Sequence, residues 1–257
     1  MRTPEARTHV EAVDTLTEAG LPTPPKWTAL RTRLEEPPPT GMLDAYRDAY
    51  LAGKADLPRL HALALAEVSA SPVDQATVAN VIEHAGLTEL QRLYAEAHPA
   101  NHTRLCDMFD ASWQKFVAAA NIVDPLTPAE HLVLATPETR QAWADAQQEQ
   151  AQLDRLLGVI RQSAAIAGLY VTTELTVTLC IDTDGQHRRR VHDAFADEHR
   201  WNALRAAGIP VRALRDLTDA QPYTHPEPLR EVWKQSPTDR RERVRVVVDP
   251  HDLEVSV

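Results

Sequence analysis

The sequence predicts an α+β protein: a mostly helical N-terminal bundle followed by a small C-terminal α/β domain with a hairpin. Two observations predict this fold class. Up to about residue 166, apolar residues recur every three or four positions, as they do on one face of a helix. After Gly168 apolar and polar residues alternate, which is typical of a strand with one buried face. We therefore expect three parts, residues 1–40, 41–166 and 167–257.

Composition and charge narrow the class of protein. The 257 residues are 43% hydrophobic and 25% charged, as in ordinary globular proteins. The net charge of −10 argues against a general DNA coat, because non-specific DNA affinity comes from Lys and Arg. Both cysteines, Cys106 and Cys180, lie in apolar runs, which indicates a reducing compartment without disulfides. With neither a signal-like N-terminus nor a membrane-length apolar stretch, we expect a cytoplasmic protein, or a virion protein if it derives from a phage.

The first part, residues 1–40, is expected to hold one helix and a proline-rich connector. Residues 4–19 fit a helix that places Val10, Val13 and Leu16 on one face and ends at Gly20. Prolines at 22–25 and 37–39 then bracket a segment that we expect to be extended.

The second part, residues 41–166, contains a series of helix signals. We expect helices from Met42 to Gly53, around Leu60 to Val68, from Pro72 to Gly86, and again from Thr88. The strongest amphipathic stretch is 105–117, and a capping box follows at Thr127 to Glu130.

A long helix is expected from Thr136-Pro137 to about residue 166. Its seam consists of residues that step by three and four: Trp143, Ala146, Gln150, Leu153, Leu157, Ile160 and Ala164. Such a seam serves either dimerisation or packing within the same domain, and both alternatives stay open.

The third part, residues 167–257, is expected to mix strands and helices. The expected order is a strand from Leu169 to Ile181, a turn over Asp182 to Gly185, a helical segment from Val191 to Leu204, a strand from Ile209 to Leu214, a short helix over 227–235, and a hairpin of 244–248 with 253–257.

The turn after the first predicted strand bears the main candidate site. Asp182 and Asp184 are two residues apart, so on a continuous strand they share a face and are able to share a divalent ion. His187 follows within reach of the same strand end. The plainer alternative is that Asp182 to Gly185 is a tight turn with no ligand.

Two runs in this region resemble a known family. They are Cys180-Ile-Asp-Thr-Asp-Gly-Gln-His187 and the stretch from Asp197 through Gly208-Ile-Pro-Val211 to Leu214. Over residues 169–235 the chain resembles the Vsr-like (very-short-patch repair) endonuclease-fold family. The resemblance implies phosphodiester hydrolysis assisted by Mg²⁺, with Asp182 and Asp184 as acids and His187 as an auxiliary base. The family also supplies an acid from the preceding strand, for which Glu174 is the nearest candidate.

Two further groups of residues are candidates for binding. His98, His102, Cys106 and Asp110 are spaced by four, and the last three align on one helix face with ligand types that suit Zn²⁺. The alternative is that Cys106 is a buried structural thiol and that Pro99 and Asn101 place His98 outside the helix. Arg188, Arg189 and Arg190 have guanidinium groups that match phosphate oxygens, although a solvated charge run explains them equally.

Two hypotheses of function follow. The first is a non-enzymatic interaction or assembly protein, such as a phage virion component, whose helical part binds partners or copies of itself and needs no cofactor. The second is a metal-dependent nuclease, or a degenerate relative that still binds DNA, with Mg²⁺ held by Asp182, Asp184 and Glu174.

Overall fold

The computed structural model describes residues 4–36, 42–51, 57–69, 72–235 and 243–250. Helices form most of this chain, as the apolar periodicity predicted. By its contacts the chain divides into two units, residues 1–99 and 100–257. The domain boundaries that we expect near residues 40 and 166 stay predictions. We describe each unit separately.

In the first unit, α1 (Pro4–Glu18) buries the predicted face of Val10, Val13 and Leu16. The segment expected to be extended is instead a helix, α2 (Pro25–Glu35). Pro25 occupies its first position, where a missing N–H costs nothing, so the proline cluster starts a helix rather than preventing one. Trp27 anchors α2 in the core.

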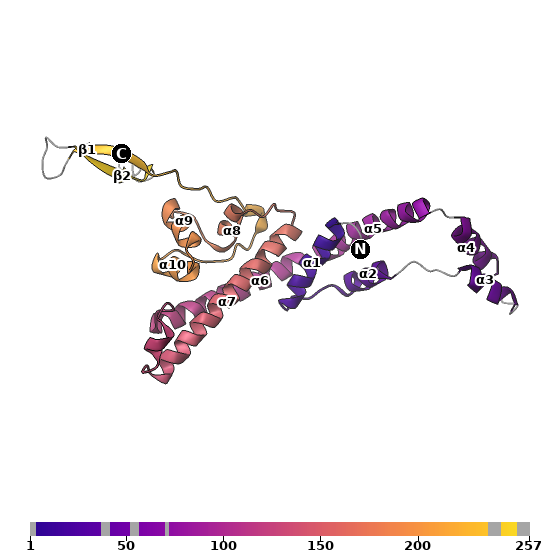
Figure 1. Cartoon of the computed structure of the whole chain (residues 1–257), viewed down its shortest axis with the longest axis horizontal. Helices are drawn as coiled ribbons and strands as arrows, with labels where there is room; N and C mark the ends of the chain where they lie inside the picture. Colours follow the sequence, from indigo (N-terminus) through magenta and orange to yellow (C-terminus); the bar gives the residue numbers. More distant parts are fainter. Residues whose placement is uncertain (1–3, 37–41, 52–56, 70–71, 236–242, 251–257) are drawn as a thin grey trace. The chain divides into compact units, whose positions relative to one another are not determined.

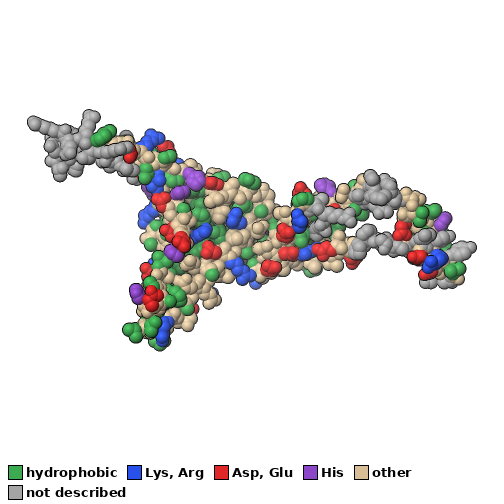
Figure 2. All heavy atoms as spheres, viewed as in Figure 1, with side chains coloured by type: hydrophobic (Ala, Val, Ile, Leu, Met, Phe, Trp, Pro, Cys, Tyr) green, Lys and Arg blue, Asp and Glu red, His purple; other side chains and the backbone are tan. Residues whose placement is uncertain are grey.

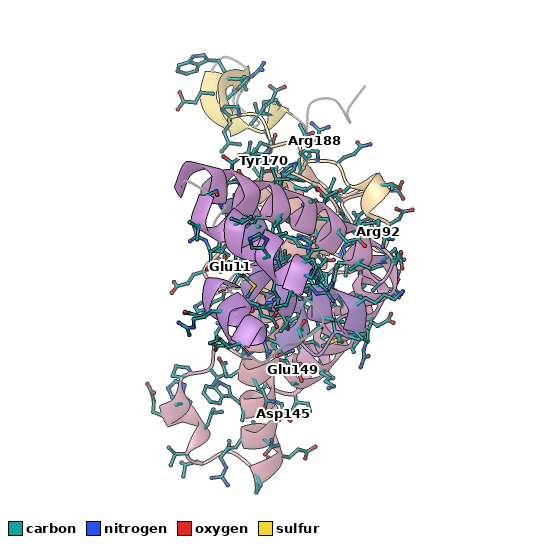
Figure 3. All side chains as sticks on the ribbon, turned by 90° about the vertical axis from the view of Figure 1, so that its right-hand side faces the viewer. Glu11, Arg92, Asp145, Glu149, Tyr170 and Arg188 are labelled. Atoms are coloured by element: carbon teal, nitrogen blue, oxygen red, sulfur yellow. The ribbon has the colours of Figure 1, made fainter. Side chains whose placement is uncertain are left out.

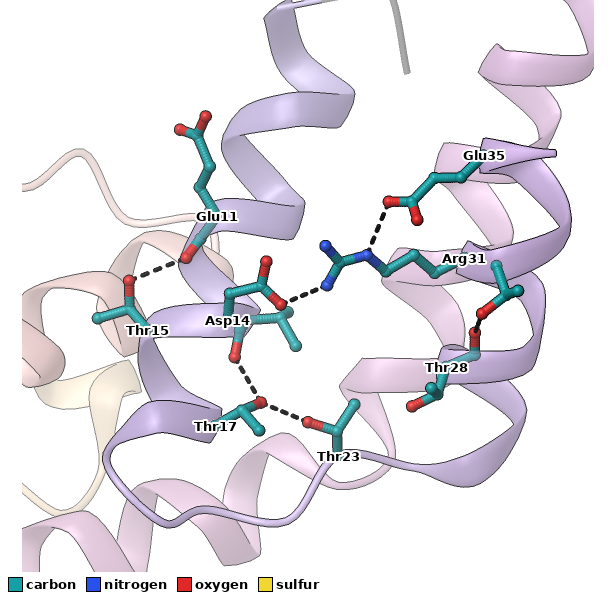
Figure 4. A network of polar contacts seen from close by, with 10 residues as sticks. Glu11, Asp14, Thr15, Thr17, Thr23, Thr28, Arg31 and Glu35 are labelled. Atoms are coloured by element: carbon teal, nitrogen blue, oxygen red, sulfur yellow. Dashed lines mark hydrogen bonds and ion pairs between the residues drawn. The ribbon is translucent and has the colours of Figure 1, made fainter. Parts of the chain in front are cut away.

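A polar network joins α1 to α2 (Figure 4). Arg31 donates to Asp14 of α1 and, at 2.9 Å, to Glu35 one turn further along its own helix. Thr17 Oγ1 donates to the Val13 carbonyl at 2.8 Å. These bonds fix the two helices on the side that faces solvent.

A single helix, α5 (Pro72–Ala95), replaces the two that were predicted to meet at Gly86. Gly86 lies inside this helix, and a Cβ there would lie 2.7 Å from both Cδ atoms of Leu34 in α2, so a larger residue would require the Leu34 side chain to shift. The glycine therefore allows close helix packing and does not mark an end. Two other predicted helices are present as α3 (Met42–Leu51) and α4 (Leu57–Ser69), which contact each other.

The second unit is organised around α6 (His98–Ile122) and α7 (Pro137–Ile166), which lie side by side in opposite directions (Figure 1). Ser112 bonds Glu149 at 2.6 Å, while His102, nearer the start of α6, bonds Ser163 near the end of α7. The seam of α7 is mostly buried within this unit, notably at Ala146, Leu153 and Ile160. The capping-box segment forms only a short 3₁₀ turn, η1 (Ala129–Leu132).

The predicted strand from Leu169 to Ile181 is wrong: residues Thr173–Cys180 form a helix, α8. Thr172 caps it by accepting a bond from the Leu175 N–H at 3.2 Å. Thr176 then donates to the Thr172 carbonyl at 2.7 Å, so its hydroxyl is satisfied inside the helix. Because nearly every side of α8 is covered, its sequence shows no helical polarity.

After α8 the chain forms α9 (Arg188–Ala196) and α10 (Arg200–Ala206), where one helical segment was expected. The predicted strand from Ile209 to Leu214 is reduced to an isolated bridge between Val211 and Ile181. A second 3₁₀ turn, η2 (Leu217–Asp219), follows. Trp201 of α10 is buried against Phe109 and Trp113 of α6, with ring centroids 5.8 and 6.4 Å apart.

The end of the described chain corrects two further predictions. Residues Arg230–Gln235 form a strand, β1, where a helix was expected, and β1 pairs antiparallel with β2 (Arg243–Val248). The partner predicted for 244–248 was 253–257, a segment that lies outside the described residues. In the described part of residues 167–257, the architecture is therefore three short helices and a hairpin, and the compact α/β domain expected there is not seen.

Candidate functional site

Asp182 and Asp184, the main candidates from the sequence, lie in a turn between α8 and α9. The Asp182 N–H donates to the Pro210 carbonyl at 3.0 Å, which ties the turn to the segment after α10. The Asp182 carboxylate accepts the Asp184 N–H at 3.2 Å, and Gly185 has a positive φ of 67°. This is an Asx turn, in which the aspartate side chain stabilises the local backbone.

A polar pocket of about 520 Å³ opens beside this turn. Asp182 and Asp184 line it together with Arg212 and Arg215 from the segment after α10 and Asp219 of η2. Three carboxylates and two guanidinium groups share the space, so the pocket is mixed in charge rather than strongly acidic. We did not predict Arg212, Arg215 or Asp219 as site residues from the sequence, because Arg212 was assigned to a strand from Ile209 to Leu214 and the path of the loop after it was unknown.

The other two predicted site residues lie elsewhere. Glu174 of α8 is not among the pocket's lining residues; it accepts a hydrogen bond from His225 Nε2 at 2.9 Å. Hydrogen bonds from His225 and then Thr172 lower the pKa of Glu174 to about 2. His187 is the residue before α9 and makes no side-chain capping bond there.

The described residues contain no group of three or more His, Cys, Asp and Glu side chains placed to hold a metal ion. Glu174, Asp182 and Asp184 all belong to the described part, and the structure does not bring these three together as one set of ligands. The strand that would have aligned them is the helix α8, which points successive residues in different directions.

The second candidate group, on α6, fastens a loop. His102 Nε2 lies 2.8 Å from the Leu214 carbonyl and its Nδ1 lies 2.9 Å from Ser163 Oγ. A carbonyl only accepts, so Nε2 carries the proton, and in the neutral ring Nδ1 then accepts the Ser163 hydroxyl. Cys106 Sγ lies 3.5 Å from the same carbonyl. Two of the three aligned side chains predicted as zinc ligands, His102 and Cys106, therefore contact the carbonyl of Leu214.

Asp110, one turn further along α6, completes this attachment. Its carboxylate accepts the Ala213 N–H at 2.9 Å and the Arg215 guanidinium at 3.1 Å. Arg215 also donates to Asp107 at 2.7 Å. Residues 213 to 215 are therefore attached to α6 by a series of hydrogen bonds, some of which involve charged side chains and some only neutral groups.

Electrostatics favour the structural role of this group. Burial lowers the pKa of His102, and burial raises the pKa of the Cys106 thiol to about 11. Both shifts favour the neutral side chains, which are the forms that make the hydrogen bonds described above. His98, predicted to lie outside the helix, is instead the first residue of α6, where Pro99 is tolerated in the first turn.

One arginine of the run, Arg189, is engaged within the molecule. Arg189 forms an ion pair with Asp249 and donates to the Glu227 carbonyl, which joins α9 to residues on either side of the hairpin. The Arg188 carbonyl accepts the Tyr223 hydroxyl. The run is not a cluster of three equivalent cations free to bind one phosphate.

A different surface lies at the connection between α6 and α7 (residues 122–136). We call it the hairpin end, after the helical hairpin that α6 and α7 form, which is distinct from the β1–β2 hairpin. Figure 2 shows hydrophobic side chains gathered at this end of the molecule. They include Leu134, Val133, Ile122 and Leu126, with exposed fractions of 97%, 68%, 54% and 46%. None of these four residues was predicted to belong to a binding surface from the sequence.

Next to the hairpin end, α6 and α7 enclose a groove of about 500 Å³. Its floor is apolar, with Ala118, Ala119 and Ile122 on α6 and Ala142 on α7. Carboxylates of Asp145 and Glu149 lie on successive turns of α7 beside it (Figure 3).

Comparison with protein-family models, curated proteins and solved structures gave no match for this chain. None of the helices in the described part is both long and apolar enough to cross a bilayer.

Proposed function

We propose that this chain is an interaction or assembly protein that binds another protein through the hairpin end of α6 and α7. The observation that supports this most is the exposure of four aliphatic side chains on one short connection, with Leu134 the most exposed at 97%. Burying one such side chain contributes about 1.5–3 kcal/mol. Single exposed apolar residues are common, but a group beside an apolar groove is typical of an interface.

The backbone that presents these side chains is held in place. Trp143 Nε1 of α7 donates to the Thr127 carbonyl at 3.1 Å, and Gln147 Nε2 donates to the Pro125 carbonyl at 2.7 Å. Asp124 accepts the Leu126 N–H at 2.9 Å, and Thr136 caps α7 by accepting the Thr139 N–H at 3.2 Å. A fixed connection loses little conformational entropy on binding, which favours recognition by a preformed surface.

Site-specific photo-crosslinking tests this proposal. A photoreactive phenylalanine analogue replaces Leu134 in the full chain, expressed in the cells that produce it, and the same analogue at Tyr170, which is 88% exposed and follows the other end of α7, serves as control. We expect a defined crosslinked protein for position 134 and none of that mass for position 170. Mass spectrometry of the product separates a second copy from another protein. Identical patterns at both positions would contradict the proposed surface.

The nuclease hypothesis remains a second candidate because Asp182 and Asp184 line one pocket with Arg212, a cation without an ion-pair partner among the described residues. Two carboxylates and an arginine suit a phosphate with a bridging cation. Plasmid cleavage with Mg²⁺ or Mn²⁺ tests it, and this function requires that Asp182→Ala and Asp184→Ala lower the rate. Equal cleavage by all three proteins would remove the pocket from consideration. The expectation that the chain belongs to a phage virion stays a prediction.

A further inference from the structure

The groove beside the hairpin end is lined in a pattern that suits a third helix. The four residues from α6, Lys115, Ala118, Ala119 and Ile122, are spaced i, i+3, i+4, i+7. Helices that pack together present this spacing to their neighbour. Figure 3 shows the adjoining stretch of α7 with Asp145 and Glu149 labelled.

The stripe on α7 continues the same pattern for three turns. Its lining residues are Glu138, Gln141, Ala142, Asp145, Gln148 and Glu149. They extend from position i to position i+11, which is about 18 Å of helix. The alanines on both helices leave room for a helix axis to approach to about 8–10 Å. A helix of about three turns therefore matches the groove in length and width.

Charge indicates which kind of helix fits. Three carboxylates, from Glu138, Asp145 and Glu149, line the groove against one ammonium group, Lys115, which leaves two negative charges uncompensated. Lys115 lies 3.9 Å from Glu149. Asp145 accepts a bond only from the neutral Gln141 among the contacts described, at 2.7 Å. A partner with Lys or Arg along one flank would pair with the Glu138 and Asp145 side of α7.

A second copy of the α6–α7 helical hairpin fits this groove less well than a basic helix does. If two α6–α7 grooves faced each other, the acidic stripes of both copies would meet, and like charges disfavour such a contact. The basic helices of this chain are also engaged, since α9 buries Val191 and Phe195 and α2 buries Trp27. The occupant is therefore expected to be a different polypeptide.

We infer that the α6–α7 groove binds a basic amphipathic helix of a partner protein, with aliphatic residues against Ile122 and the alanine floor and Lys or Arg toward Glu138 and Asp145. This inference rests on the proposed function and specifies the partner's chemistry.

Synthetic peptides test this inference with the full-length protein. The probe is a helical peptide of about 14 residues with a Leu stripe spaced i, i+3, i+4, i+7 and Lys on its flanks. The control peptide has Glu in place of each Lys. By fluorescence anisotropy we expect the Lys peptide to bind at least roughly tenfold more tightly than the Glu peptide, with a preference that decreases as salt rises. Equal affinities, or no binding of either peptide, would overturn the inference.

Two variants locate the binding. Ala118→Trp fills the groove from an exposed position, and Asp145→Lys reverses one rim charge. Asp193→Lys makes the same substitution on α9, at a side chain that is 64% exposed and lies outside both the groove and the hairpin end, and is the matched control. We expect the first two to weaken Lys-peptide binding by roughly tenfold or more and the control to leave it within about twofold. Far-ultraviolet circular dichroism verifies that each variant is folded.

The outcomes separate this inference from the proposed function. If both peptides bind alike while position 134 still crosslinks to a partner, the basic-helix chemistry is wrong and the interaction surface stands. If position 134 gives no specific crosslink, the proposed function fails whatever the peptides do. Unchanged binding in Ala118→Trp and Asp145→Lys would place the peptide elsewhere and overturn the groove.

Discussion

His102 shows how one buried side chain determines where a loop lies. It connects Ser163 of α7 to the Leu214 carbonyl, so three separate segments meet at one imidazole. Its neutral form satisfies both partners, whereas a ring protonated at both nitrogens could no longer accept the Ser163 hydroxyl proton, which would need another acceptor. The same position in the sequence looked like a metal ligand because histidine serves both purposes equally well.

The stability of the folded chain should therefore decrease on acidification. Burial lowers the pKa of His102, and also of His9, below the usual 6.5. The unfolded chain then binds more protons below about pH 6.5, so this contribution to stability is present above that pH and is lost as pH falls toward the folded-state pKa. Urea unfolding between about pH 7.5 and 5 measures it.

The variant His102→Gln isolates the share of this residue. We expect it to be about 1–3 kcal/mol less stable than wild type near neutral pH, because buried partners lose hydrogen bonds. Its free energy of unfolding should also decrease less between pH 7.5 and 5 than that of wild type, and His9 accounts for part of the decrease that remains. If the free energy of unfolding of the variant and of wild type decreased equally with pH, His102 would bind no additional proton on unfolding.

Asp110 and Asp107 provide a comparison of two carboxylates that bind the same arginine. Asp110 also accepts the Ala213 N–H, and its side chain is 27% exposed against 60% for Asp107. We expect Asp110→Ala to cost about 1–3 kcal/mol and Asp107→Ala less than about 1 kcal/mol. Chemical denaturation of both variants checks the order, and a larger loss for Asp107→Ala would contradict it.

At the scale of elements, α8 is the clearest case in which tertiary contacts decide the conformation. Its sequence, Thr173-Glu-Leu-Thr-Val-Thr-Leu-Cys180, alternates and is rich in β-branched residues, so local propensity favours a strand. Leu175, Val177 and Leu179 are buried, and so are Thr176 and Cys180 between them. Burial on nearly all sides removes the polarity pattern from which a helix is predicted.

The N-cap of α8 should contribute measurably to its stability. Thr172→Ala removes the side-chain acceptor of the Leu175 N–H, for an expected loss of about 1 kcal/mol. Thr172→Ser should retain most of the stabilisation that this N-cap provides. Thr173→Ala changes the same residue type at the exposed next position and should be nearly neutral. Hydrogen exchange of the α8 amides reports the loss directly, and equal exchange in the two alanine variants would argue against the cap.

At the scale of the whole molecule, each unit has its own buried aromatic residues: Trp27 and Tyr94 in the first, Phe109, Trp113 and Trp201 in the second. We expect a fragment of residues 98–257 to fold without the first unit, because it has buried aromatic residues of its own. Cooperative thermal unfolding with a near-ultraviolet circular dichroism signal would support this. A fragment that retains helix but lacks that signal would show that the second unit depends on the first.

How far the sequence predicts this fold depends on how each segment is buried. Helices α1, α6 and α7 expose one side to solvent, so their apolar residues repeat at helical spacing. The extents of α1 and α7 were predicted closely, whereas for α6 only the stretch 105–117 was predicted and His98 was wrongly placed outside the helix. The predictions for α2 and for Gly86 in α5 were wrong because proline and glycine were interpreted as ends, whereas Pro25 starts a helix and Gly86 makes room for Leu34.

The sequence by itself determined that this chain is mostly helical and where its long amphipathic helices lie, since a half-buried helix records its orientation in its own residues. Only the tertiary structure decided that α8 is a helix, that β1 pairs with β2, and that the side chains of Asp182 and His102 form hydrogen bonds with backbone groups. The reason is physical: these outcomes depend on which distant groups satisfy a hydrogen bond or cover a side chain, and neighbouring residues carry no record of that choice.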